Sequence, residues 1–306
     1  MIGMSMIRWS FNLAVMAFTV IALSSCEKPI MPEDAGGGNV TLTFTASCSD
    51  VSVSSGSPAG ITRAASTNLS AYFTKLNVQV FDAWGEKVFS TMKTQTKDDA
   101  DFGSLTCQLE AGTYTVVAVG HSSIKSATIK SPTMVQFTAS DGEKLTDTFC
   151  ACQQIEVGNV ELQQTFQMQR MTAMVQFKLT DENIPESFAR MVIGYTGGSA
   201  NFNPTTSQGT TKSTQSESRP AVSSQVYQVY TFPYMAATGT LKMTLTAYDT
   251  NGTSLRQRVF DAVPVTRNRI TTYTGQFFDG TEGEFTQAAF GFSVNGDWDG
   301  EDQYEF

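Results

Sequence analysis

Short segments in which apolar and polar residues alternate recur along almost the whole chain, and they constrain the fold more than any other feature. Val40, Leu42 and Phe44 alternate with threonine, the two-residue period of a half-buried β-strand. Further strands are expected at residues 76–81, 87–91, 104–110, 113–120, 133–139, 144–152, 160–169, 172–179, 188–195, 225–232, 240–248, 255–260, 269–278 and 288–294. Helical signals are almost absent; only residues 181–185 are compatible with one short turn. The pattern predicts an all-β protein built from β-sandwiches.

Length and composition indicate two such sandwiches. Charged residues make up only 16% of the chain, whereas Thr, Ser, Gly, Val and Phe are plentiful, and this composition favours strands. Without the first 25 residues about 280 remain, enough for two domains of ~140 residues. We expect an N-terminal sandwich at residues 39–168 and a C-terminal sandwich at 169–306, with a long polar loop at 197–220. No strict repeat is visible, so this division rests on length and strand count.

The first 26 residues predict export and attachment to lipid. Arg8 precedes an apolar run, residues 11–23, that is too short to span a bilayer as a helix, which needs ~20 residues. The run matches the apolar core of a secretory signal and ends in Leu-Ser-Ser-Cys, a lipobox. We therefore expect a signal peptide at residues 1–25, acyl chains on Cys26, and a flexible Pro- and Gly-rich spacer at 26–38. The alternative is an ordinary signal followed by a chance cysteine.

The charge of the chain argues against two classes of partner. The net charge of −9 becomes −10 when the segment with Arg8 is removed, and no Lys/Arg cluster is present. Binding to nucleic acid needs concentrated positive charge to neutralise phosphates, so no nucleic acid partner is expected. Anionic lipid headgroups make the same demand, so the attached lipid must provide the membrane binding.

Four cysteines remain besides Cys26: Cys48, Cys107, Cys150 and Cys152. An exported protein can form disulfides. The last two lie two residues apart in an expected strand, so both thiols face the same side. Their spacing does not match the usual zinc motifs, and the chain has only one histidine. Free buried thiols are favoured, one disulfide is the main alternative, and a metal site is the least favoured.

No constellation of residues indicates catalysis, a cofactor or a metal. The only histidine, His121, is next to Ser122 and Ser123 in sequence, which is no triad, and a structural role is favoured. Acidic pairs at residues 98–99 and 282/284 fall in polar turns and are interpreted as solvated charges. No nucleotide-binding glycine motif or nucleophile-elbow motif occurs. We therefore expect a protein that is not an enzyme.

Two further segments can be interpreted either as binding sites or as structural elements. Residues 295–300 resemble the first half of a calcium loop, but Asn295 replaces the first Asp and Phe306 stands where the loop needs Glu. The favoured reading is an acidic turn with Trp298 packed against the sandwich. Tyr227 and Tyr230 could bind sugars, although their strand spacing favours positions in the core or on the sheet surface.

Several segments occur together in an order and spacing typical of one family. They are the Cys26 lipobox, TRA (62–64), LNVQVF with the Gly85 turn (76–85), AGTYTVVAVGH (111–121), TDTF (146–149), RMTAMV (170–175), YTGGS (195–199), YTFP (230–233), VPVTRNRIT (263–271) and TGQFF (274–278). Together they resemble the FimB-type fimbrial lipoproteins of the Bacteroidetes, within the type V pilin group. The resemblance covers essentially the whole chain.

The resemblance implies two tandem transthyretin-like β-sandwich domains after a lipoprotein signal peptide, export to the outer membrane, and fimbrial subunits as partners. In stalk pilins of this group a protease cuts after an arginine in the first loop. The first strand then leaves, and a strand of the next subunit replaces it. Arg63 lies where that cut would fall, just after the strand expected at residues 40–53. Anchor subunits keep their lipid and are not cut.

Two hypotheses about function follow from the sequence. The first is a structural subunit of cell-surface fimbriae, at the anchor, an accessory position or the tip, tethered by lipid to the outer membrane. The alternative is a surface lipoprotein that binds a glycan or a protein of a host or bacterial surface independently of fimbriae. Assembly through a partner's strand would distinguish them, because a sugar-binding protein needs no such strand.

Overall fold

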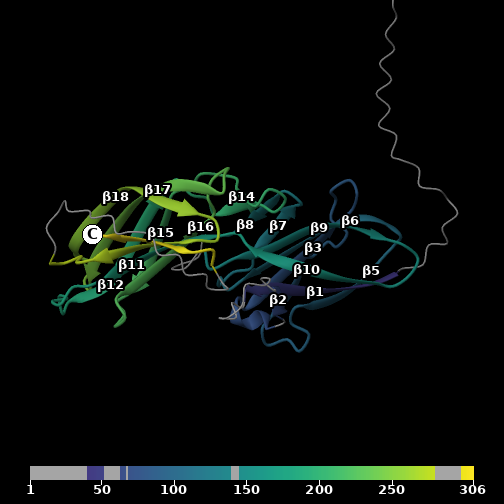
Figure 1. Ribbon diagram of the computed structural model, residues 1–306, viewed down its shortest axis with the longest axis horizontal. Coiled ribbons are helices and arrows are strands. Elements are labelled where there is room, and N and C mark those ends of the chain that lie inside the picture. The colour runs from purple at the N-terminus through teal and green to yellow at the C-terminus, as the bar shows by residue number, and fades with distance from the viewer. Residues whose placement is uncertain (1–39, 52–62, 67, 139–144, 280–297) are drawn as a thin grey trace, which may run out of the picture. The chain divides into compact units, whose positions relative to one another are not determined.

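Twenty β-strands and one 3₁₀ turn (η1, Leu69–Ala71) make up the regular structure of the computed structural model, which describes residues 40–51, 63–66, 68–138, 145–279 and 298–306 (Figure 1). The signal peptide and the spacer lie outside these residues. The described part contains no α-helix, and no helix there is long and apolar enough to cross a membrane. The prediction of an all-β fold made of β-sandwiches is confirmed.

The N-terminal sandwich is formed by one continuous series of paired strands that folds back on itself. The strand order is β2-β1-β10-β9-β6-β3-β4, and β5 also pairs with β1. Its strands are β1 (Val40–Val51), β2 (Arg63–Ser66), β3 (Lys75–Phe81), β4 (Lys93–Thr96), β5 (Ser104–Leu109), β6 (Gly112–His121), β9 (Phe149–Val157) and β10 (Leu162–Arg170). Strands β9 and β10 pair only at one end, through Cys150 with Gln169 and Phe149 with Arg170. Both parts of the path contribute side chains to one shared apolar core.

The turn after β3 forms as expected, but the strand after it does not. The carboxylate of Asp82 accepts hydrogen bonds from the backbone N–H of Trp84 and of Glu86, both at 2.9 Å, and Gly85 adopts a positive φ of 80°. The strand predicted at residues 87–91 is wrong: this segment makes only an isolated bridge between Phe81 and Lys87, and β4 begins at Lys93.

The C-terminal sandwich consists of two four-stranded sheets, in the orders β16-β11-β19-β20 and β15-β12-β17-β18. Its strands are β11 (Ala173–Leu179), β12 (Phe188–Thr196), β15 (Gln215–Pro220), β16 (Val226–Thr231), β17 (Thr238–Asp249), β18 (Ser254–Thr266), β19 (Ile270–Gly275) and β20 (Glu301–Glu305). The sheets share one core, and β15 and β16 are edge strands. The short turn expected at residues 181–185 is not helical. Instead Asp181 accepts hydrogen bonds from the backbone N–H groups of residues 277–279.

A third sheet joins strands from the two halves of the chain, and we call it the bridging sheet. Its order is β14 (Gln208–Gly209), β13 (Asn201–Asn203), β8 (Met134–Gln136) and β7 (Thr128–Ser131). Phe202 is fully buried in a core that includes Val117 and Val119 of β6. The prediction of a long loop at residues 197–220 is therefore wrong. The buried Phe202 and pairing with β8 convert polar residues into β13, while β14 pairs with β13 and β15 pairs with β12.

The final strand, β20, was not expected from the sequence. It pairs in parallel with β19, where Tyr304 stacks on Tyr273 with ring centroids 4.7 Å apart. Its acidic residues meet cations: Arg269 bonds Asp302 at 2.7 Å, and Lys178 lies 3.3 Å from Glu301. A Cβ atom on Gly275 would lie only 1.6 Å from the carbonyl oxygen of Phe306, so the end of the chain fits only against glycine. The strand expected at residues 288–294 lies outside the described residues.

Candidate functional site

Strand β1 has neighbours along both of its edges. Residues 42–48 pair in parallel with residues 162–168 of β10. On the other edge, residues 40–45 pair with β5, and residues 48–51 pair with β2. Without β1, both β5 and β10 would present rows of unpaired N–H and C=O groups, which can accept another strand.

The inner face of β1 also completes the apolar core. Its buried side chains are Val40, Leu42, Phe44, Ala46 and Cys48. The ring of Phe44 meets that of Phe166 edge to face, with centroids 5.2 Å apart. This confirms the alternation seen in the sequence. Full burial of a large apolar side chain contributes about 1.5–3 kcal/mol, so loss of β1 would expose a costly apolar groove.

The two residues predicted as processing sites are only partly within the described structure. Arg63 begins β2, and its backbone pairs with Val51 at the end of β1. Residues 52–62, between the two strands, lie outside the described residues, as does Cys26. Lipidation of Cys26 and cleavage after Arg63 therefore stay predictions.

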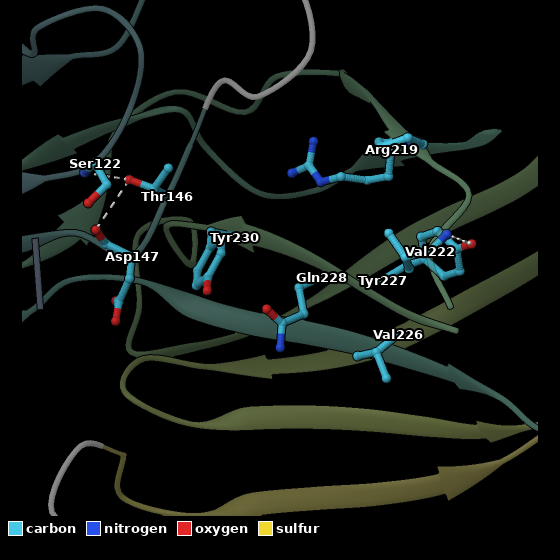
Figure 2. Close-up of a pocket in the computed structure, with 10 residues that line it drawn as sticks. Ser122, Thr146, Asp147, Arg219, Val222, Val226, Tyr227, Gln228 and Tyr230 are labelled. Atoms are coloured by element: carbon cyan, nitrogen blue, oxygen red, sulfur yellow. Dashed lines mark hydrogen bonds between the residues drawn. The ribbon is translucent and has the colours of Figure 1, made fainter. Parts of the chain in front are cut away.

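A pocket of about 430 Å³ lies beside the edge strands β15 and β16 (Figure 2). Its lining residues are Ser122, Thr146, Asp147, Arg219, Pro220, Val222, Val226, Tyr227, Gln228 and Tyr230. In Figure 2, Ser122, Thr146 and Asp147 lie on one side, Val222 and Val226 lie on the other, and Gln228 and Tyr230 lie between them. Sequence analysis singled out Tyr227 and Tyr230 but missed the polar residues, because they come from four separate segments of the chain.

One wall of the pocket includes Asp147, which forms a largely buried ion pair with Arg170. Arg170, whose side chain is 5% exposed, donates to Asp147 through Nε at 2.8 Å and Nη2 at 2.8 Å. Its Nη1 donates to Asn268 at 2.9 Å. The guanidinium also lies 4.6 Å from the ring of Phe149 and 3.9 Å from that of Trp298. The predicted packing of Trp298 is thus confirmed, and the pair ties β9 and β10 to the C-terminal sandwich.

The opposite wall contains a second ion pair. Glu217 is buried, and its carboxylate accepts hydrogen bonds from Arg219 and from the hydroxyl of Tyr195, the latter at 2.9 Å. Burial, together with the carboxylate of Glu217, raises the pKa of Tyr195 well above its ordinary value. The phenol therefore stays protonated, and its single hydrogen is shared between Glu217 and the carbonyl of Tyr230, each 2.9 Å away, which ties the edge strand β16 to this ion pair.

His121 is fully buried beneath the pocket wall and has a structural set of partners. Its Nε2 lies 2.8 Å from Asn77 Oδ1, and its Nδ1 accepts a hydrogen bond from the backbone N–H of Ser123 at 3.1 Å. Burial, aided by the charge of Lys75, lowers the pKa of His121 to about 4. The imidazole is therefore neutral near neutral pH and supports the segment that carries Ser122.

The buried histidine predicts that the protein loses stability in mild acid. In the unfolded chain His121 takes up a proton below its ordinary pKa of about 6.5, whereas in the folded protein it does so only near pH 4. Unfolding therefore becomes more favourable as the pH falls through this window, by about 2 kcal/mol between about pH 7 and about pH 5. Urea unfolding at several pH values measures this slope.

His121→Gln is the control for this prediction. Since His121 is the only histidine, the variant should be less stable at neutral pH but nearly flat over the same range. An unchanged slope in His121→Gln would contradict the assignment.

Cys107, Cys150 and Cys152 are free thiols, and the first two are buried. Burial raises the pKa of Cys107, Cys150 and Cys152, which disfavours the reactive thiolate form. Within the described ranges no group of three or more His, Cys, Asp or Glu side chains is placed to hold a metal ion. Most of the segment that resembles a calcium loop lies outside these ranges.

A family model described as "Family of unknown function (DUF6562)" matches residues 32–306. The chain belongs to the DUF6562 family. The match begins before β1 and extends to the last residue, so this family covers both sandwiches and the bridging sheet. No curated protein matches the chain.

Solved structures with a similar arrangement come from the Bacteroidetes. A candidate adhesin from Bacteroides ovatus is 11% identical, with a TM-score of 0.46 over 73% of this chain and 83% of that one. A fimbrial assembly protein from Parabacteroides distasonis is 13% identical, with a TM-score of 0.42 over 78% and 92%. The fimbrial anchor protein Mfa2 from Porphyromonas gingivalis is 14% identical, with a TM-score of 0.37 over 72% and 82%. At these values the similarities establish no shared function.

Proposed function

We propose that this protein is a structural subunit of a cell-surface fimbria, assembled by β-strand exchange and held to the outer membrane by lipid on Cys26. The observation that carries the proposal is the position of β1. This strand lies between β10 on one edge and β5 and β2 on the other, and its five inward side chains complete the core. A strand from another subunit could replace it with the same contacts.

The order of elements around β1 supports a release mechanism. β1 is the first described strand, and Arg63 comes directly after the segment that follows it. Among the described residues, β2 pairs only with β1. After a cut, β2 would therefore not connect β1 to any other strand. Cleavage after Arg63 would separate the lipidated N-terminus and β1 from the rest of the chain. The resulting groove would offer the edges of β5 and β10 to a neighbour's strand.

The uncut form of the protein would act as an anchor instead. It would keep β1 in place and stay attached through Cys26, and it would contribute a strand or surface elsewhere to the fibre. We also propose that the two sandwiches are separate domains divided at residues 168/169. This division is supported by distinct apolar cores that draw on residues 40–168 and on residues 173–277.

Replacement of Arg63 distinguishes the cut form from the anchor form. If the protein is a cut stalk subunit, Arg63→Ala should remain full-length in the membrane fraction and be absent from fibres, while the wild-type subunit in fibres begins at Ala64. Arg63→Lys keeps the charge but removes the arginine, so it should behave as Arg63→Ala. Cys26→Ala should leave the membrane fraction and gives the baseline for an untethered protein. N-terminal sequencing and electron microscopy of labelled fibres are the measurements.

If the protein is an anchor, both Arg63 variants should behave as wild type and fibre-bound protein should retain its lipidated N-terminus. Cells lacking the whole protein should then shed their fibres. Normal, firmly attached fibres on such cells would reject the fimbrial proposal in both forms.

A further inference from the structure

The pocket beside β15 and β16 has the dimensions of a small-molecule site. Its volume of about 430 Å³ falls within the ~300–1,000 Å³ typical of ligand pockets. Part of its lining comes from strands, since Gln228 and Tyr230 lie on β16 and Arg219 lies on β15, whereas Ser122, Thr146, Asp147 and Val222 lie in connecting segments. Hydrogen bonds from Ser122 N–H to Thr146 Oγ1 at 2.9 Å and from Tyr195 to the carbonyl of Tyr230 fix both sides. A site that is already ordered loses little entropy when a ligand binds.

The charges of the pocket are neutralised inside its own walls. The Asp147 carboxylate is paired with Arg170, and the Arg219 guanidinium is paired with Glu217, whose side chain is fully buried. An anionic ligand would be repelled by Asp147, and a cationic ligand would be repelled by Arg219. Neither ligand would find a net opposite charge in the lining. The electrostatics therefore favour a ligand that is polar but uncharged.

The remaining lining combines hydroxyl, amide and apolar groups. Ser122 brings a hydroxyl that accepts from the backbone N–H of Thr74 at 3.1 Å and keeps its own proton to donate. The hydroxyl of Thr146 is already bonded to Ser122 N–H, Ser123 and the carbonyl of Asp147, so Thr146 shapes the wall. Gln228 donates through Nε2 to Gln176 at 2.6 Å, and no described residue donates to its Oε1. Pro220, Val222 and Val226 add an apolar side, and Tyr230 adds an aromatic ring. A sugar ring has the matching character, with a rim of hydroxyls and an apolar C–H face.

We propose that this pocket binds a neutral saccharide, with its hydroxyls at Ser122 and Gln228 and its C–H face toward Tyr230 and Val226. The site takes residues from both sandwiches, so it forms only when the bridging sheet and the Arg170–Asp147 pair hold them together. It adds a recognition function that is independent of strand exchange, because neither β1 nor Arg63 lines the pocket.

The test uses the full mature protein in detergent and a panel of neutral glycans that includes lactose, maltose, cellobiose and N,N′-diacetylchitobiose. Saturation-transfer NMR identifies binding, and titration calorimetry measures the dissociation constant of the best ligand, which is expected in the micromolar to millimolar range. Sialyllactose and inorganic phosphate are the charged probes and should bind at least tenfold more weakly than the best neutral member.

Two pairs of variants locate the binding. Val222→Trp fills the pocket from an exposed position and should abolish binding, whereas Val259→Trp, at another exposed valine, on β18, should leave it unchanged. Gln228→Leu removes the amide at similar volume and should weaken binding about tenfold, the loss of roughly one good hydrogen bond. Gln257→Leu is its match, since Gln257 also makes one cross-strand bond, to Thr246 at 3.1 Å, away from the pocket. Melting temperatures check that all four variants are folded.

Three results would overturn the inference. The first is no saturable binding of any neutral glycan at millimolar concentration. The second is a preference for the charged probes. The third is binding that survives Val222→Trp, which would place the ligand elsewhere on the protein. A peptide that binds with unchanged affinity to Gln228→Leu while no sugar binds would indicate strand addition at the edge of β16 instead.

Discussion

Phe44→Ala is expected to lower the free energy of unfolding by about 3–5 kcal/mol, the range for deleting a buried phenylalanine from a core. The Phe44 side chain is fully buried and contacts Phe166 edge to face at 5.2 Å. It lies at the centre of β1, between β5 and β10, where backbone pairing on both sides limits collapse of the cavity. Scanning calorimetry and urea unfolding of the mature protein measure the loss.

Two variants of β1 serve as controls for this result. Phe44→Leu keeps most of the apolar volume and should cost about 1.5 kcal/mol or less. Thr45→Ala changes the exposed neighbour on the opposite face and should stay within about 0.5 kcal/mol. If Phe44→Ala were no more destabilising than Thr45→Ala, β1 would not complete the core, and the strand-exchange proposal would lose its basis.

Arg170→Ala is expected to cost a similar amount, about 3–5 kcal/mol, because it leaves the largely buried carboxylate of Asp147 without its counter-charge. Asp147 would retain the hydroxyl of Thr172 at 3.0 Å but lose the three hydrogen bonds that it accepts from Nε and Nη2 of Arg170. The stacking of the guanidinium between Phe149 and Trp298 would also disappear. Arg170→Lys should recover only part of the lost stability, because an ammonium group cannot form two parallel hydrogen bonds to a carboxylate or stack on aromatic rings as a guanidinium does.

An exposed ion pair in the same molecule is the matched control. Lys242 and Asp261 are 2.8 Å apart, with side chains 61% and 78% exposed, so Lys242→Ala should change the stability by less than about 1 kcal/mol. Calorimetry compares the two variants directly. Equal, small effects of Arg170→Ala and Lys242→Ala would show that the junction is not held by the buried pair.

Periodicity in the sequence predicted the strands that bury one face in a large core. β1 is the clearest example, because Val40, Leu42 and Phe44 show the two-residue alternation that a half-buried strand requires. The turn at residues 82–85 could also be predicted from the sequence, because Asp82 and Gly85 determine the conformation of the residues next to them. These are local effects, and local sequence carries them.

The short polar strands were missed for the opposite reason. β13 contains one apolar residue, Phe202, and exists because it pairs with β8 from the other half of the chain. β20 is acidic and becomes a strand only where Lys178 and Arg269 compensate its charges. Neither stretch has a strand signal of its own, since the stabilising partners lie far away in sequence.

The sequence by itself determined that the chain is all-β, that its apolar residues lie on alternating faces, and that its single histidine has no catalytic neighbours in sequence. Only the tertiary structure decided which strands are neighbours, that Arg170 is paired with Asp147, and that residues from four segments line one pocket. The physical reason is that alternation specifies which face of a strand is buried. Pairing and charge compensation depend on residues that meet only after the chain has folded.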